Sequence, residues 1–220
     1  MDLPAQSPAA FSPEKADKAQ AILTGALEVF TTHGYAAASM ARIAAAAGVS
    51  KPTLYSYFQD KEGLFVALIQ HLTYNNSRLL SDPAVLDMSL PPDKMMRKIL
   101  KSVIKNSSHN KTFIALIRLI ISESEQFPQL SQAFIREVSK PMLERFALYL
   151  TMHPQLNLPD PMVTARIIAG TMVHYMITQE IMHGSEILPM DAERLVDGLI
   201  DVVMLAGGAP HLSTAAHPPA

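Results

Sequence analysis

Apolar residues recur along most of this chain at the three-to-four-residue spacing of amphipathic helices. The first helix has one apolar face, formed by Ile22, Leu23, Ala26, Leu27 and Phe30. Ser12 and Pro13 suit its start, and Gly34 suits its end. Runs of alternating polar and apolar residues, which predict strands, do not occur, and there is no internal repeat. The pattern therefore predicts an all-α fold of about nine helices.

Two very short helices follow the first one. Ser39 is placed to cap the segment MARIAAAA, Gly48 to make a turn, and Ser50 to cap KPTLYSYF, with Pro52 in its first turn. Apolar side chains that can pin this unit to the first helix are Ile43, Ala44, Ala47, Val49, Leu54 and Phe58. The outward side chains carry groups that contact phosphates and base edges, at Ser50, Lys51, Thr53, Tyr55, Ser56 and Tyr57. The segment from Ser39 to Phe58 thus predicts a helix-turn-helix.

Proline, glycine and aspartate mark the later helices. Asp60 can cap a fourth helix that runs to about Leu80, and Pro141 should kink or divide an otherwise helical segment that Pro128 opens. Further helices are expected at about 92–109, 111–126, 160–183 and 191–207. The helix at 111–126 is apolar almost all round, so we expect it at the centre of the core.

Composition limits the class of protein. The 220 residues are 49% hydrophobic and include no cysteine, which excludes disulfides and thiolate metal sites and suggests a reducing compartment, the cytoplasm. The N-terminal segment lacks the features of a signal peptide, and Arg118 and Glu123 interrupt the best candidate for a membrane span. A formal net charge of −2 gives no overall attraction to nucleic acid, so DNA binding must depend on a local arrangement.

The stretch IAAAAGVSKPTLYSYFQDKEGLF closely resembles the pattern of TetR-family transcriptional regulators, and ALEVFTTHGY extends the resemblance. FIALIRLIISESEQFPQLSQAF resembles the C-terminal domain of the AefR-like subgroup. The resemblance implies a sequence-specific DNA-binding regulator, a repressor that a small, largely apolar ligand releases from its operator. Residue by residue, it implies contacts with the DNA backbone by Ser39 and Arg42, with base edges by Lys51, Pro52, Thr53 and Tyr55, and with phosphates by Tyr57 and Lys61. Pro52 is better explained as helix punctuation than as a base contact, and the alternative for Lys51 and Lys61 is that they are solvated charges.

This interpretation divides the chain into two domains and two tails. We expect a DNA-binding domain at 13–60, a ligand-binding and dimerisation domain at 61–206, and disordered tails at 1–12 and 207–220. The last two helices carry more apolar surface than one core can cover, which predicts a homodimer. The residues expected at its interface are Ala165, Ala169, Met172, Met176, Leu195, Leu199 and Val202. In the alternative, both helices are buried within a monomer.

The resemblance also places an apolar inducer site among the fourth to eighth helices. Its candidate residues are Phe113, Ile117, Ile121, Phe134, Met142, Phe146, Met172 and Tyr175, each of which also suits a plain core position. Arg118 lies in the apolar helix at 111–126. Its guanidinium needs a partner there, which is either Glu123, Glu125 or an anionic ligand. His174 is interpreted as a hydrogen-bonded core histidine.

The sequence contains no Glu-x-x-His pairs on facing helices, which a carboxylate-bridged metal site would need, and no nucleophile elbow, phosphate-binding loop or dinucleotide motif. We therefore expect a non-enzyme without cofactor or metal, whose partners are double-stranded operator DNA, a small-molecule inducer and a second copy of itself. The expected mechanism is a population shift, in which the ligand tilts the fourth helix beside Lys61 and changes the distance between two recognition helices. The alternative is an all-α metabolite-binding protein or enzyme with no specific DNA role.

Overall fold

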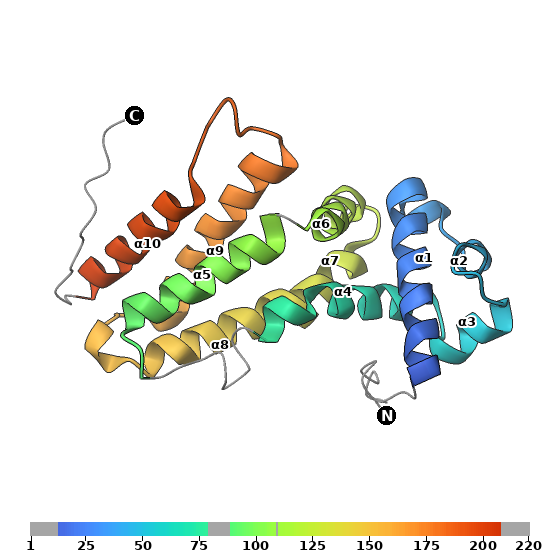
Figure 1. The fold of residues 1–220 in the computed structure, drawn as a ribbon, viewed down its shortest axis with the longest axis horizontal. Helices are drawn as coiled ribbons and strands as arrows, with labels where there is room; N and C mark the ends of the chain where they lie inside the picture. Colours follow the sequence, from blue (N-terminus) through green and yellow to red (C-terminus); the bar gives the residue numbers. More distant parts are fainter. Residues whose placement is uncertain (1–12, 79–88, 109, 208–220) are drawn as a thin grey trace. The chain divides into compact units, whose positions relative to one another are not determined.

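The computed structural model describes residues 13–78, 89–108 and 110–207, and these are helical with short connections (Figure 1). They form two compact units: the described residues of unit 1 are 13–74 and 111–139, and those of unit 2 are 75–78, 89–108, 110 and 140–207. Unit 1 holds α1 (Pro13–Ala37), α2 (Met40–Ala46), α3 (Lys51–Tyr57), most of α4 (Lys61–Arg78), α6 (Lys111–Glu123) and α7 (Pro128–Phe134). Unit 2 holds α5 (Pro92–Ser108), α8 (Lys140–Thr151), α9 (Pro161–Met176) and α10 (Ala192–Ala206). The all-α expectation is confirmed, and the tails expected at 1–12 and 207–220 lie outside the described residues except for Gly207, which caps α10.

Aromatic packing organises the core of unit 1. Three aromatic rings contact one another with centroids 5.4–5.6 Å apart, those of Phe30 and Tyr35 on α1 and of Phe65 on α4. The Phe127 ring centroid lies 5.2 Å from that of Tyr35. Edge-to-face and offset pairs of this kind add stability beyond the area that they bury. Leu116, which is fully buried, comes from α6 into the same core. The helices that follow residue 60 therefore complete the core that supports α2 and α3.

The helix at 111–126 is amphipathic rather than apolar all round. One side of α6 is buried, but Arg118 is exposed and Ile121 is 55% exposed. The expected central position therefore holds for one face only.

Helix ends follow the expected capping residues. Asp160 Oδ1 accepts hydrogen bonds from the backbone N–H groups of Met162 and Val163, and Asp191 Oδ1 accepts one from Arg194. These carboxylates satisfy donors that have no partner in the first turn of a helix. After Met176 the chain continues as a π-helical segment to Ile181, close to the expected end at His183.

Pro141 divides the helix that Pro128 opens, as expected. Residues Ile135–Ser139 form a π-helical segment between α7 and α8, and Pro141 lies in the first turn of α8. Because proline has no N–H to donate, a change in the hydrogen-bonding pattern just before it removes the conflict. If α7 and α8 are counted as one divided helix, the described part of the chain has the nine helices that the sequence predicts.

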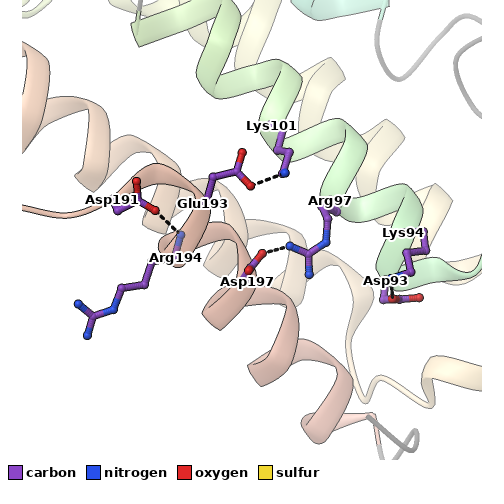
Figure 2. Close-up of polar contacts among 8 residues, drawn as sticks. All are labelled: Asp93, Lys94, Arg97, Lys101, Asp191, Glu193, Arg194 and Asp197. Carbon is purple, nitrogen blue, oxygen red and sulfur yellow. Dashed lines mark hydrogen bonds and ion pairs between the residues drawn. The ribbon is translucent and has the colours of Figure 1, made fainter. Parts of the chain in front are cut away.

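Unit 2 combines a methionine-rich core with ion pairs between α5 and α10. Met95 and Met96 are fully buried on α5, beside residues of α8, α9 and α10. Figure 2 shows Arg97 and Lys101 of α5 directed at Asp197 and Glu193 of α10, with which they form ion pairs. These pairs are partly exposed, so they fix the register of the two helices more than they stabilise the fold.

Candidate nucleic-acid interface

Serine caps and one glycine fix the backbone of the helix-turn-helix. Ser39 Oγ accepts a hydrogen bond from the backbone N–H of Arg42 at 3.2 Å, and Ser50 Oγ accepts one from Thr53 at 3.1 Å. Gly48 has φ +66, a left-handed conformation that glycine adopts without strain. The turn between α2 and α3 is therefore determined locally, as the sequence predicts.

Apolar residues attach this unit to α1. Ile43 and Leu54 are fully buried in the core of unit 1, and Val49 and Phe58 pack against it. The sequence does not predict the close packing of Gly25 on α1 against the backbone of Ala47. A Cβ at Gly25 would lie 2.8 Å from the backbone nitrogen of Ala47. Only glycine allows α1 to approach the turn this closely.

The outward residues divide into exposed groups and groups that bond within the unit. Seven of the expected DNA contacts are exposed, namely Ser39, Arg42, Ser50, Lys51, Pro52, Tyr55 and Ser56, whereas Thr53 and Tyr57 are half-buried. Thr53 Oγ1 lies 2.7 Å from Ser50 Oγ, and Ser56 Oγ donates to the Thr53 carbonyl at 2.6 Å. The Lys51 ammonium lies 6.0 Å from the Tyr55 ring. Lys51 and Tyr55 are thus the long polar side chains at the surface of α3, the predicted recognition helix.

Arg42 and Tyr57 also make contacts within unit 1. Arg42 Nη1 donates to the carbonyl of Ala37 at 3.2 Å, which steers the guanidinium toward the end of α1. The Tyr57 ring packs against the core of unit 1, with its centroid 6.4 Å from that of Phe58. Both residues are therefore partly structural, whatever they contact on DNA.

Lys61 makes contacts within unit 1 that the sequence does not predict. Its ammonium donates to the backbone carbonyls of Tyr35 at 2.7 Å and Ala38 at 3.0 Å, and it lies 4.2 Å from the Tyr35 ring centroid. Burial lowers the pKa of Lys61, while the nearby Glu123 carboxylate raises it. The phosphate contact of Lys61 stays a prediction, and in this structure the cation binds carbonyls at the end of α1.

Glu123 of α6 binds the same segment from another side. Its Oε1 accepts a hydrogen bond from the backbone N–H of Tyr35 at 2.9 Å. Gly34 has φ +77, and a Cβ there would lie 2.7 Å from the same Oε1. Tyr35 is thus tied to α4 through its carbonyl, to α6 through its N–H, and to Phe30 and Phe65 through its ring.

The residues expected to bind an inducer are distributed over both units. Phe113, Ile117, Arg118, Ile121 and Phe134 belong to unit 1, whereas Met142, Phe146, Met172 and Tyr175 lie together in the core of unit 2. Phe113 and Ile117 are buried. The exposure of Ile121 and Arg118 does not fit an apolar site wall, and His174, expected in the core, is exposed as well.

The expected dimer residues lie on more than one face of their helices. Ala165, Met172 and Leu199 are buried in the core of unit 2, so a partner cannot reach them without repacking. Ala169, Met176 and Leu195 are half-buried, and Val202 is 61% exposed. The exposed apolar side chains of these helices are instead Val163, Ile167, Val173, Val202 and Leu205.

Two further classes of site are absent from the described part of the chain. None of its helices is long and apolar enough to cross a membrane. No three of its histidine, aspartate or glutamate side chains are grouped closely enough to hold a metal ion.

Comparison with known proteins places these features in context. Residues 22–68 match the model for bacterial regulatory proteins of the tetR family, and residues 94–208 match that for the C-terminal domain of AefR-like transcriptional repressors. The transcriptional regulator RutR of Escherichia coli K12 is 31% identical over 121 residues, a match that covers 55% of this chain and 48% of RutR. This chain thus spans about half the length of that relative.

Two solved structures share the fold over most of both chains. The flavonoid-responsive regulator FrrA has a TM-score of 0.68 at 26% identity, with 86% of this chain and 96% of FrrA covered. FadR of Bacillus subtilis, in complex with stearoyl-CoA, has a TM-score of 0.67 at 19% identity, with 85% of this chain and 98% of FadR covered.

Proposed function

Because this chain belongs to the TetR family of bacterial regulatory proteins, with an AefR-like C-terminal domain, we propose that it is a dimeric repressor that a small apolar ligand releases from operator DNA. The family consists of transcriptional regulators, which confirms the expectation of a non-enzyme. Operator DNA lies in the bacterial cytoplasm, so the proposal places the chain there.

The observation that carries this proposal is the surface of α3. Leu54 holds the helix from inside, while Lys51, Tyr55 and Ser56 are exposed on its outer side. An ammonium, a phenol and a hydroxyl on a short, well-capped helix suit phosphate contact and base-edge contact in a major groove. With Lys61 directed inward, few cations remain near this surface, so affinity should depend on two half-sites being bound at once.

A dimer would supply the second half-site. The exposed face of α9 and α10 carries Val163 and Ile167 on one helix and Val202 and Leu205 on the other, each at least half exposed. Gly170 lies on α9 with open space where a Cβ would be, which suits close approach of another helix. We therefore revise the proposed interface from the buried residues Ala165, Met172 and Leu199 to this exposed face.

The chemical class of ligand is proposed from two similarities. FrrA responds to flavonoids, and FadR was solved with stearoyl-CoA. Both kinds of ligand have large apolar parts. The core of unit 2 contains Met95, Met96 and Met172, and unbranched methionine side chains adapt to ligands of irregular shape.

Signal transfer is proposed to run through the contacts of Tyr35. The helix α4 begins at Lys61 in unit 1 and ends in residues that belong to unit 2, so one continuous helix joins the two. A ligand that favours a different position of α4 would move Lys61 and the end of α1, and with them α2 and α3. Binding to two half-sites about one helical turn apart would then be lost through a population shift.

Footprinting on DNA flanking the gene tests the proposal. We expect a two-fold symmetric protected region that disappears with a hydrophobic inducer. Tyr55→Ala should abolish protection and leave the dimer intact, whereas Ile167→Asp should give monomers that no longer protect the site.

Ile187→Asp is the matched control, because Ile187 is 88% exposed outside α9 and α10. A monomeric Ile167→Asp variant with an unchanged footprint would contradict the dimer. Ligand binding without any protected DNA would favour the metabolite-binding alternative.

A further inference from the structure

Two polar groups lie inside the apolar core of unit 2 without a hydrogen-bond partner among the described residues. They are the Tyr149 hydroxyl and His153 Nε2, on side chains only 2% and 5% exposed. The two rings are in contact, with centroids 4.7 Å apart, and Phe146 stacks on Tyr149 with its centroid at 6.1 Å. Tyr149 lies in the last turn of α8, and His153 follows shortly after the end of that helix.

Such a pair is costly in a folded protein. A buried hydroxyl or ring nitrogen that loses water without gaining a partner destabilises the folded state, and native cores satisfy nearly all such groups. Phenylalanine would fill nearly the same volume as Tyr149 without that cost. A phenol and an imidazole kept side by side in a core therefore suggest a partner that is bound from outside the chain.

The hydrogen-bonding state of both groups follows from their neighbours. Gln155 Nε2 lies 3.0 Å from His153 Nδ1, and an amide nitrogen can only donate, so Nδ1 accepts and Nε2 carries the proton. Burial lowers the pKa of His153, which keeps the imidazole neutral. Burial, together with the charge of Asp93, raises the pKa of Tyr149 to about 12, which keeps the phenol protonated. Both groups are therefore neutral donors.

The surroundings exclude a negatively charged partner. Buried residues of the same core are Met95, Met96, Phe146, Leu150 and Leu156. The carboxylate of Asp93, which lies 3.7 Å from the Lys94 ammonium at the start of α5 (Figure 2), disfavours the tyrosinate and would equally repel a bound anion. An uncharged oxygen on an apolar molecule suits both the apolar surroundings and the nearby carboxylate.

We infer that Tyr149 and His153 form a recognition pair for the carbonyl oxygen of an uncharged, apolar small molecule. The inference rests on the proposed ligand-responsive function and names the chemical class of its ligand. The Tyr149 hydroxyl and His153 Nε2–H donate to one acceptor, while Phe146 and the methionines of α5 surround its apolar part.

The first test uses the stability of the full-length protein without ligand. Tyr149→Phe removes a polar group that has no partner, so it should raise the thermal unfolding midpoint by about 2–4 °C. The control is Tyr74→Phe: Tyr74 is 53% exposed, so removing its hydroxyl relieves no buried polar group, and its midpoint should not rise. A fall in the midpoint of Tyr149→Phe would mean that the hydroxyl stabilises the fold, which would overturn the inference.

The second test compares three probes of similar size by NMR titration: acetophenone with a carbonyl, ethylbenzene without one, and benzoate with a charge. The wild type should bind acetophenone about 30-fold more tightly than ethylbenzene, as two hydrogen bonds allow. It should bind benzoate more weakly still. Tyr149→Phe should reduce this preference to about fivefold, because only the bond from His153 remains, and Tyr74→Phe should keep it in full.

Equal binding of acetophenone and ethylbenzene, tighter binding of benzoate, or no binding of acetophenone at its solubility limit would overturn the inference. DNA binding is measured on the same samples without probe. A carbonyl preference in a protein that binds no DNA would refute the proposed function and leave the recognition pair intact. Normal DNA binding without that preference would refute the recognition pair and leave the proposed function intact.

Discussion

Replacing Lys61 with methionine separates two roles that this residue could have in DNA binding. Methionine keeps the unbranched apolar stem and removes the ammonium. In the structure that ammonium donates to the carbonyls of Tyr35 and Ala38 and lies over the Tyr35 ring. The structure therefore assigns the charge to the joint between α1 and α4, whereas the sequence pattern assigns it to a phosphate.

The expected loss of stability follows from these contacts. The two hydrogen bonds share one charged donor and together contribute about 1.5–3 kcal/mol, and the ring contact adds about 0.5–1 kcal/mol. The burial that lowers the pKa of Lys61 offsets part of this gain. We expect a net loss of about 2 kcal/mol, or a fall in the unfolding midpoint of about 4–8 °C for a chain of this size.

Two measurements on each variant distinguish the roles. Urea unfolding at fixed protein concentration gives stability, and fluorescence anisotropy on a random-sequence duplex gives affinity as a function of salt. Lys51→Met is the matched control, since Lys51 is exposed on α3. It should leave stability within about 0.5 kcal/mol of the wild type. It should also reduce the slope of log affinity against log salt by about 0.9 for each phosphate that the protein no longer neutralises.

The expected pattern for Lys61→Met is the opposite one, with reduced stability and an unchanged salt slope. If Lys61→Met reduces the slope as much as Lys51→Met does and leaves stability unchanged, the inward role of Lys61 is refuted and the phosphate role restored.

Two other predictions follow from the contacts described above. Gly25→Ala should destabilise the protein by about 1–3 kcal/mol in urea unfolding, because the added Cβ meets the Ala47 backbone. The same substitution at the exposed Gly198, which has open space around it, should stabilise by up to about 1 kcal/mol, and equal effects at both sites would contradict the close approach. Burial lowers the pKa values of His71 and His153, so the folded state binds fewer protons than the unfolded state, and stability should fall as pH decreases below about 6.5. His153→Phe should flatten that dependence and replacement of the exposed His33 by Gln should not, as measured by unfolding midpoints across pH.

Local features of the fold could be predicted from the sequence because their causes are local. Ser39 and Ser50 cap helices whose N–H groups lie three residues away, and Gly48 makes the turn between them. Leu54 at the centre of the recognition helix is likewise found from helical spacing alone.

Contacts between distant segments could not be predicted in this way. Lys61 meets the carbonyl of a residue 26 positions earlier, and Glu123 meets the N–H of a residue 88 positions earlier. No periodicity encodes such pairs. A lysine that follows a recognition helix is as consistent with a phosphate contact as with the carbonyls that it binds.

The two faces of α9 show a second limit. Apolar residues occur nearly all round this helix, so the spacing that places Ala165 and Met172 together also places Val163 and Ile167 together. The structure buries the first pair in the core of unit 2 and leaves the second pair half exposed. Only packing against α5 and α8 decides which face is internal.

The contacts of Tyr35 have a consequence for domain exchange between regulators. A chimera joined at residue 60 would carry the helix-turn-helix without Lys61, Phe65 and Glu123, and would leave the end of α1 with neither its cation nor its carboxylate. The transferable module is instead unit 1 as a whole, whose two chain segments run to Tyr74 and from Lys111 to Ser139. A new operator specificity is therefore better grafted by exchanging the surface residues of α3 than by transplanting the domain.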